Sequence, residues 1–484
     1  MTYTGKGLYY SMKSKKILAM LLACTLMLSA AACTKQDETG SGSSSGSGTT
    51  NQIEVGVYQY KTDAGDALTK AANTFMNANP DIKININSMG MGDDYRTELT
   101  GMYNATPAPV IFNIQSQQDL TDWSGRLEDL TAEPWVENAV EGSLLPVTQN
   151  DKIYGMPVAI EGYGFVYNRA IFETAGIDTS TLTTYKDIEA AMKMLKTKIA
   201  AGELKEKYPA LEAVTELPAK ETWVTGVHTL NLALAGEFAG PSEAYNAASI
   251  KLENSEALRE LYDLQATYSK YSEDRGKLNE VDYKTQIAGG LATERIAMVQ
   301  QGNWVYNEVA AVNKDVARNL DMLPLPLNGV IEDSISVGVP MYWCINSAST
   351  EPEKAAAKKF LNWLYQSEEG KRIVIDELGF IPPFTNYDDL EPEDPLSKAV
   401  KKYAENSKTI PWVFTGFPHA WGQEVFGVNV QRYFSGEMTW DEIVNDAKLK
   451  WEEARKDMAD AIAPDNSSSG SSPGEAANSS STVA

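Results

Sequence analysis

Few residues of this 484-residue chain are spaced for catalysis. Its two histidines, His228 and His419, lie near no cysteine and no carboxylate pair with metal-binding spacing. G-x-S-x-G strings at residues 42–46 and 470–474 lie in serine- and glycine-rich stretches, whereas a hydrolase nucleophile requires a strand–turn–helix. Neither H-E-x-x-H nor a P-loop occurs. Acidic residues are too abundant for counting to exclude a glycosidase pair. The pattern nevertheless predicts that the protein is not an enzyme and holds no metal or cofactor.

Polar and aromatic side chains at two predicted strand ends could instead bind a ligand. Tyr58 and Gln59 end the first predicted strand, and Asn113, Gln115 and Ser116 follow the third. Open α/β sheets bind ligands at the carboxyl ends of their strands. Amide and hydroxyl groups can donate and accept hydrogen bonds, and aromatic faces pack against C–H groups. These five residues are therefore candidate ligand contacts.

A different chemistry is indicated at Cys33. Lysines within residues 13–16 precede an apolar run at residues 17–32, and small residues precede Cys33, which is the pattern of an export signal. Residues 30–33 resemble a bacterial lipobox, in which the cysteine receives a palmitate-type lipid, although Ala30 replaces the usual leucine. The apolar run is shorter than the ~20 residues that span a bilayer, so an uncleaved anchor is the weaker alternative. The sequence predicts a signal peptide at residues 1–32 and a protein lipid-anchored at the extracellular face of the cell membrane.

The cysteines exclude an internal disulfide in such a mature chain. Cys24 leaves with the signal and Cys33 carries the lipid, so Cys344 alone remains. Cys344 lies in an apolar, strand-like run, which favours a buried thiol over a reactive one.

Composition divides the chain into a body and two flexible ends. Residues 33–51 and 466–484 are rich in glycine and serine, which predicts a flexible tether and a disordered tail. The remaining body is too long for one core and suits two lobes. The net charge of −24 becomes four charges more negative when the lysines of the signal are removed. So acidic a surface disfavours nucleic acid as a partner.

The elements that must position the candidate residues follow an α/β pattern. Apolar residues alternate over 53–57 and 82–86, as in strands, and a helical stripe covers 68–76 between them. This βαβ unit implies a parallel sheet covered by helices, and residues 109–114 predict its third strand. Thr350 and Glu353 have capping-box spacing before an apolar helical face, and residues 438–455 predict a final amphipathic helix. After residue 33, no segment is long and apolar enough to span a membrane.

Four blocks of the body resemble the carbohydrate-type extracellular solute-binding proteins, family 1, of ABC importers, the family of maltose-binding protein. The most specific block runs from Lys152-Ile153-Tyr154-Gly155-Met156-Pro157 through Tyr167-Asn168-Arg169 to Ala175-Gly176-Ile177. The other three blocks are residues 104–131, 294–304 and 355–383.

The resemblance implies two α/β lobes with a ligand cleft between them and hinge strands connecting them. The crossings are expected at residues 157–165, at residues 334–339 and after Phe384. The N-terminal lobe would comprise 52–160 and 337–386, and the C-terminal lobe 161–336 and 387–465. Closure of the cleft by a hinge motion is the working principle of this family.

Further candidate contacts follow from the resemblance. Trp304 occupies the position of the family's cleft tryptophan, with core packing as the alternative. Glu161 and Tyr163 fall on the first crossing, where Glu161 would accept hydrogen bonds from hydroxyl groups or pair structurally. Trp412 and Trp421 lie where the second lobe of the family places another aromatic residue. Trp343 is predicted to be half structural and Trp363 to pack within its helix, whereas Trp223 and His228 lie in a region without a matching block and receive no role.

The implied function is a lipid-anchored receptor, a monomer, that captures a sugar or oligosaccharide and delivers it to ABC permease subunits. Two alternatives remain open at this point. One is a surface carbohydrate-active hydrolase. The other is a receptor of the same fold for a non-sugar ligand or a sensor kinase.

Overall fold

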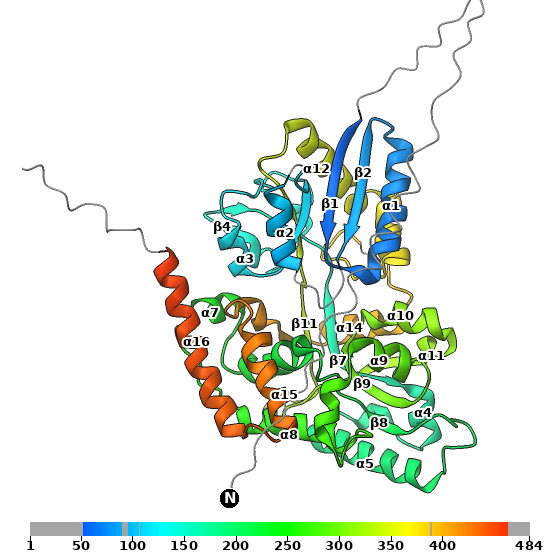
Figure 1. The fold of residues 1–484 in the computed structure, drawn as a ribbon. Coiled ribbons are helices and arrows are strands. Elements are labelled where there is room, and N and C mark those ends of the chain that lie inside the picture. The colour runs from blue at the N-terminus through cyan, green and yellow to red at the C-terminus, as the bar shows by residue number, and fades with distance from the viewer. Residues whose placement is uncertain (1–51, 90–94, 106, 388–389, 463–484) are drawn as a thin grey trace, which may run out of the picture. The chain divides into compact units, whose positions relative to one another are not determined.

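The computed structural model describes residues 52–89, 95–105, 107–387 and 390–462, which form an α/β protein (Figure 1). Its strands form two large sheets and one small two-stranded sheet. The first sheet has the strand order β2 (Ile82–Ser88), β1 (Ile53–Gln59), β3 (Ile111–Ile114), β12 (Tyr342–Ile345), β6 (Met156–Pro157). The second has the order β13 (Thr409–Pro411), β11 (Ile335–Gly338), β7 (Glu161–Asn168), β9 (Ile296–Gly302), β8 (Ala213–Thr215), with β10 (Leu320–Leu323) also paired to β7. The small sheet pairs β4 (Thr148–Gln149) with β5 (Lys152–Ile153).

The helices fall into sequence groups around these strands. Those before β4 and directly after β12 are α1 (Gly65–Ala78), α2 (Tyr95–Tyr103), α3 (Gln117–Asp122), α12 (Glu351–Gln366) and α13 (Glu368–Arg372). Those between β7 and β10 are α4 (Arg169–Thr174), α5 (Tyr185–Ala201), α6 (Leu230–Ala235), α7 (Pro241–Asn246), α8 (Ser255–Thr267), α9 (Tyr283–Gln286), α10 (Val305–Val312) and α11 (Lys314–Arg318). The last are α14 (Pro395–Glu405), α15 (Val428–Phe434) and α16 (Trp440–Ile462).

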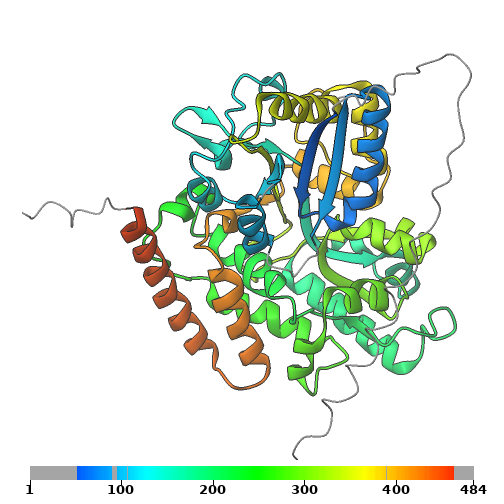
Figure 2. The same cartoon turned by 45° about the horizontal axis from the view of Figure 1, so that its top comes forward.

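The predicted βαβ unit is confirmed. Strands β1 and β2 pair in parallel, and α1 lies beside them (Figure 2). Their alternating apolar residues enter a core shared with one face of α1. That helix buries Leu68, Ala71, Ala72 and Phe75, the stripe expected from its 3.6-residue period. It ends at Ala78 with Asn79 as its C-cap, because the residue before a proline is disfavoured in helical conformation. β3 then pairs in parallel with β1, so both strands end at one edge of the sheet.

The chain passes three times between the two large sheets, twice through short connections and once along the stretch between β12 and β13. β6 belongs to the first sheet, and residues 158–160 connect it to β7 in the second. In return, β11 belongs to the second sheet, and residues 339–341 connect it to β12 in the first. Every residue of β7 is buried, and this strand pairs with β9, β10 and β11.

Several local predictions agree with the structure. The capping box of Thr350 and Glu353 begins α12. Trp343 is buried and its indole nitrogen donates to the Tyr365 hydroxyl at 3.1 Å, while Trp363 packs on Phe75 and Phe360. The Cys344 thiol is buried, which raises its pKa well above the usual value and makes it unreactive. The final helix begins at Trp440 and extends beyond the predicted end.

Some predictions lie outside the described residues: the signal peptide at 1–32, the lipid at Cys33, the tether at 33–51 and the tail at 466–484. Within the described ranges, no helix combines the length and apolarity needed to cross a bilayer.

Two π-helical segments, η5 (Val224–Thr229) and η10 (Trp421–Gly427), touch at glycines. A Cβ atom on Gly226 would lie 1.8 Å from the carbonyl oxygen of Gly422 and 2.6 Å from the backbone nitrogen of Gly427. Real Cβ atoms do not approach backbone so closely, so this contact requires glycine.

We therefore expect Gly226→Ala to lower the unfolding free energy by about 1–3 kcal/mol, because two backbones must separate. Gly101→Ala is the matched control. Gly101 is exposed in α2 with open space where a Cβ atom would lie, so alanine there should be neutral or stabilising by up to about 1 kcal/mol. Urea denaturation of the two variants measures the difference, and equal stabilities would contradict the packing argument.

Candidate ligand-binding site

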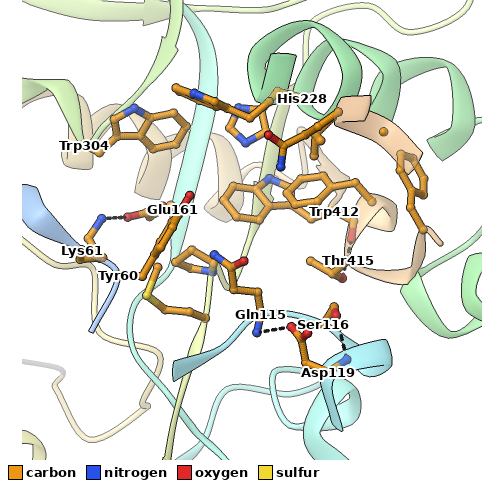
Figure 3. A pocket seen from close by; sticks show the side chains of 18 of the residues that line it. Tyr60, Lys61, Gln115, Ser116, Asp119, Glu161, His228, Trp304, Trp412 and Thr415 are labelled. Carbon is orange, nitrogen blue, oxygen red and sulfur yellow. Dashed lines mark hydrogen bonds and ion pairs between the residues drawn. The ribbon is translucent and has the colours of Figure 1, made fainter. Parts of the chain in front are cut away.

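A cavity of about 240 Å³ lies where loops from both large sheets meet (Figure 3). From the first sheet, the residues after β1 and β3 line it: Tyr60, Lys61, Thr62, Asp63, Gln115, Ser116 and Asp119. From the second sheet and its helices come Glu161, Trp223, Val227, His228, Tyr283, Trp304, Glu308, Trp412, Phe414 and Thr415. Pro340 and Met341, which connect β11 to β12, and a stretch between Phe417 and Gln423 complete the lining.

The polar residues that follow β3 are held in place by the capping box at the start of helix α3. Ser116 is the N-cap of α3, where its side chain accepts a hydrogen bond from the backbone of Asp119, and Asp119 accepts from the backbone of Ser116 in return. Asp119 also accepts from the backbone nitrogen of Gln115 at 3.0 Å. This capping box holds the loop after β3 in one conformation, so Gln115 and Ser116 are presented to the cavity without further ordering.

Aromatic residues from the second sheet form a cluster, of which His228, Trp304 and Trp412 lie opposite Ser116 and Asp119 in Figure 3. This aromatic cluster consists of Tyr163, Trp223, His228, Trp304, Trp412 and Phe414. His228 lies at its centre. Its ring stacks on Tyr163 with centroids 4.3 Å apart and planes 6° apart, and it lies 5.5 Å from Trp304 and 5.9 Å from Trp412.

Burial governs the ionisation of His228. Loss of water contact lowers the pKa of its imidazole to about 3, so the ring is neutral at physiological pH. The Tyr163 hydroxyl also donates to the His228 carbonyl oxygen at 2.8 Å, which ties this part of η5 to β7. The cluster therefore presents flat, uncharged faces to the cavity.

A buried ion pair joins the two sheets beside these rings. The Lys61 ammonium, in the loop after β1, contacts Glu161 at the start of β7 and lies 3.1 Å from Asp63. Burial by itself would lower the pKa of Lys61, but the negative charges of Asp63 and Glu161 outweigh it and raise that pKa. Burial raises the pKa of Glu161, and Lys61 opposes this effect. The lysine is therefore charged and held between two carboxylates.

A further carboxylate lies one helical turn beyond Trp304. Glu308 belongs to α10, whose N-cap is Trp304, and it lies beside Tyr283. Burial raises the pKa of Glu308, and the negative charge of Asp63 adds to this effect. The described residues include no group of three or more potential ligands placed to hold a metal ion.

Five of the ten predicted contact residues line the cavity: Gln115, Ser116, Glu161, Trp304 and Trp412. Gln115 and Ser116 follow β3 at the carboxyl end of the first sheet, and Glu161 begins the crossing strand β7. Trp304 and Trp412 follow strands of the second sheet. Direct ligand contact by these five residues remains a prediction.

The other five predicted residues are absent from the lining. Gln59 and Asn113 lie behind it, where both hold the turn after β1: the Gln59 amide bonds both backbone groups of Lys61, and the Asn113 oxygen accepts from the Tyr60 nitrogen at 3.1 Å. Tyr58 is buried and stacks on Tyr95, with ring centroids 4.8 Å apart.

Tyr163 and Trp421, the other two predicted contacts that are absent from the lining, lie in the core of the second lobe. Tyr163 is covered by His228, so it supports the cavity wall from behind. Trp421 is buried against Trp451, and its indole nitrogen donates to the Ala447 carbonyl at 3.1 Å. The structure therefore places these five residues outside the cavity lining, because pairing and packing direct their side chains elsewhere.

Sequence reasoning missed several lining residues, among them Tyr60, Lys61, Trp223, His228 and Glu308. Tyr60 and Lys61 could have been found, since they directly follow the strand end that was singled out. Glu308 could have been found from its i, i+4 spacing to Trp304. Trp223 and His228 carry no such signal, because a π-helix far along the chain brings them to the site.

Comparison with known protein families shows to which family the chain belongs. Residues 70–408 match the family of bacterial extracellular solute-binding proteins. The chain belongs to this family. Among relatives of this solute-binding protein is the xylose/arabinose-binding protein XacG of Haloferax volcanii, 24% identical over 427 residues, or 83% of this chain and 86% of the relative. An uncharacterized ABC transporter extracellular-binding protein of Pyrococcus horikoshii is also 24% identical, over 419 residues, or 82% and 87% of the two chains.

Solved structures show the same two-lobed fold. A chitin oligosaccharide binding protein superposes with a TM-score of 0.67 at 20% identity, covering 84% of this chain and 100% of the other. The solute-binding protein RafE in complex with raffinose gives a TM-score of 0.64 at 18% identity, with the same coverage. The predicted fold class and family are thereby confirmed.

The low pKa of His228 makes the stability of this solute-binding protein depend on pH. Below about pH 6.5 the unfolded chain binds a proton at this residue, but the folded protein does so only near about pH 3. Stability is therefore complete above the unfolded pKa and falls as the pH drops toward the folded pKa, by at most about 1.4 kcal/mol per pH unit.

We expect His228→Phe, which keeps a ring against Tyr163, to flatten this dependence in urea denaturation between about pH 4 and pH 6.5. His419→Phe is the control and should change the slope less, because Asp119, Asp122 and Glu424 oppose the effect of burial on the pKa of His419. An unchanged slope in His228→Phe would show that the histidine is not buried in neutral form.

Proposed function

We propose that the protein is a lipid-anchored receptor on the extracellular face of the cell membrane that captures a sugar or oligosaccharide and delivers it to an ABC permease. The observation that carries this proposal is the cavity itself, in which Trp304 and Trp412 lie across from Gln115 and Ser116. Sugars carry C–H faces and a ring of hydroxyl groups. Aromatic faces match the first, and amide, hydroxyl and carboxylate groups match the second.

The relatives support this ligand class. One curated relative is named for binding xylose and arabinose, and two solved structures are named for chitin oligosaccharide and raffinose. These ligands differ in size and linkage, so the relatives suggest a saccharide without identifying it. The size of the cavity is close to the lower end of the range for small-molecule sites.

Capture would work by hinge motion. The lining comes from both large sheets, and two short connections, residues 158–160 and 339–341, join them beside the cavity. A ligand that touches both sides stabilises the closed arrangement through contacts that an open arrangement lacks. The permease would then recognise the closed form.

If the protein were a hydrolase, two carboxylates of the cavity would act as catalytic groups. Glu161 and Glu308 both line the cavity, and burial raises the pKa of each. However, Glu161 contacts the charged Lys61, and the family is a family of binding proteins. Incubation of purified protein with a labelled oligosaccharide separates the two functions, because a receptor returns the ligand intact. A different observation separates a transport receptor from a sensing receptor. Permease genes next to the gene for this protein would favour transport, and a neighbouring sensor-kinase gene would favour sensing.

We expect residues 51–465 to bind at least one member of a panel of mono- and oligosaccharides. A ligand at 100 times its Kd should stabilise the fold by about 2.7 kcal/mol, which thermal denaturation detects. Trp304→Ala should weaken this binding by at least about tenfold, because an aromatic contact contributes on the order of 1 kcal/mol or more.

Trp363→Ala is the matched control for that experiment. Trp363 packs on α1 in the first lobe and is absent from the cavity lining, so this variant should keep the affinity even if its stability falls. Absence of any hit across the panel, with intact fold by circular dichroism, would contradict the sugar-receptor proposal.

We also expect Cys33→Ser to remove the lipid and release the protein from cells into the medium, because the serine hydroxyl cannot replace the lipidated thiol. Cys24→Ser, within the signal peptide, should leave the protein in the membrane fraction. Labelling with a palmitate analogue and fractionation measure both variants. Retention of unlabelled Cys33→Ser protein in the membrane would indicate an uncleaved anchor instead.

A further inference from the structure

Negatively charged side chains outnumber positively charged ones in the lining of the cavity. Besides its histidines and tyrosines, its ionisable groups are one ammonium, Lys61, and four carboxylates, Asp63, Asp119, Glu161 and Glu308. Asp119 is compensated by Arg96, whose guanidinium lies 3.4 Å away, and by the backbone of the α3 start. Three carboxylates and one ammonium therefore remain at the end of the cavity beside Tyr60.

Glu308 is the carboxylate left without a cation. Lys61 pairs with Asp63 and Glu161, and no ion pair of Glu308 is formed within the described ranges. Burial raises the pKa of Glu308 and the negative charge of Asp63 adds to this effect, whereas the Tyr283 side chain and the positive charge of Lys61 oppose it. In a partly buried site such a charge is costly unless a ligand supplies the counter-charge.

Aromatic residues lie near this carboxylate. Trp304 lies one turn before Glu308 on the same face of α10, and Tyr283 lies beside Glu308. Trp223 completes the group, with its ring 6.0 Å from Tyr283 and 6.4 Å from Trp304. A cation beside a carboxylate and near the faces of Trp and Tyr is stabilised by both the charge and the ring quadrupoles.

Another polar atom of the lining is also unsatisfied. Trp412 is nearly fully buried, and its indole nitrogen has no hydrogen-bond partner in the described part of the chain. An indole N–H is only a donor, so a ligand oxygen is a suitable partner. A ligand with hydroxyl groups at one end and a cation at the other fits both observations.

We propose that the ligand carries a protonated amine, as in an amino sugar or an oligosaccharide of amino sugars with free amines, bound by Glu308 within the faces of Trp223, Tyr283 and Trp304. This inference rests on the saccharide-receptor function proposed above and specifies its ligand class. Uronates and sugar phosphates are disfavoured, because their negative charge would meet three carboxylates and one ammonium.

The test compares saccharides that differ only at one substituent. Matched series of the gluco and galacto configurations, as monosaccharides and short oligosaccharides, carry a free amine, an N-acetyl group or a hydroxyl group at the same carbon. Isothermal titration at about pH 6, where an aliphatic amine is protonated, gives each affinity. We expect the amine to bind at least about tenfold more tightly than its acetyl and hydroxyl counterparts, with a preference that weakens as salt is added.

Glu308→Gln keeps the shape of the side chain and removes its charge. It should abolish the preference for the amine and retain binding of the hydroxyl counterpart. Asp315→Asn is the control: it makes the same charge change on the exposed helix α11 and should keep the preference.

Each outcome is decisive. Equal or weaker binding of the amines would overturn this inference and leave the saccharide receptor standing. A preference that survives in Glu308→Gln would overturn the role of Glu308. If no member of any series binds, the receptor function itself fails, and the inference fails with it.

Discussion

The complete burial of β7 is the constraint on which the rest of the structure depends. This strand pairs with three others, and all eight of its residues are buried. A Cβ atom on Gly164 would lie 2.4 Å from the carbonyl oxygen of Leu323, so β10 approaches as closely as backbone allows. Because β7 directly follows the connection from the first sheet, it also fixes where the two sheets meet.

The cavity follows from the start of this strand. Glu161, its first residue, holds Lys61 from the first sheet, and Tyr163, two residues later, lies beneath His228. Residues two positions apart on a strand lie on the same face of the sheet. Glu161 and Tyr163 therefore both contribute to the cavity: Glu161 lines it, and Tyr163 supports the lining residue His228 from behind. The buried charge of Lys61 is tolerable because two carboxylates surround it, so the loop after β1 is positioned by electrostatics as well as by packing.

Much of the fold could be predicted because it depends on local patterns. The alternation in β1 and β2, the stripe of α1 and the capping box of α12 each record burial of one face, which period and composition reveal. The candidate site was predicted only in part. Strand ends located the right loops, but Gln59 and Asn113 turn inward to bond the backbone of Tyr60 and Lys61, which themselves line the cavity. Such a difference of one or two residues depends on the turn geometry.

The sequence by itself determined the α/β class, the family and the loops that carry candidate contacts, since these follow from periodicity and from motifs of neighbouring residues. Only the tertiary structure decided which side chains share the cavity. Trp223, Glu308 and Trp412 come together there from segments far apart in the chain. Trp223 precedes a π-helix, Glu308 lies in α10 and Trp412 follows β13, so their proximity depends on contacts between distant segments, which no local sequence pattern specifies.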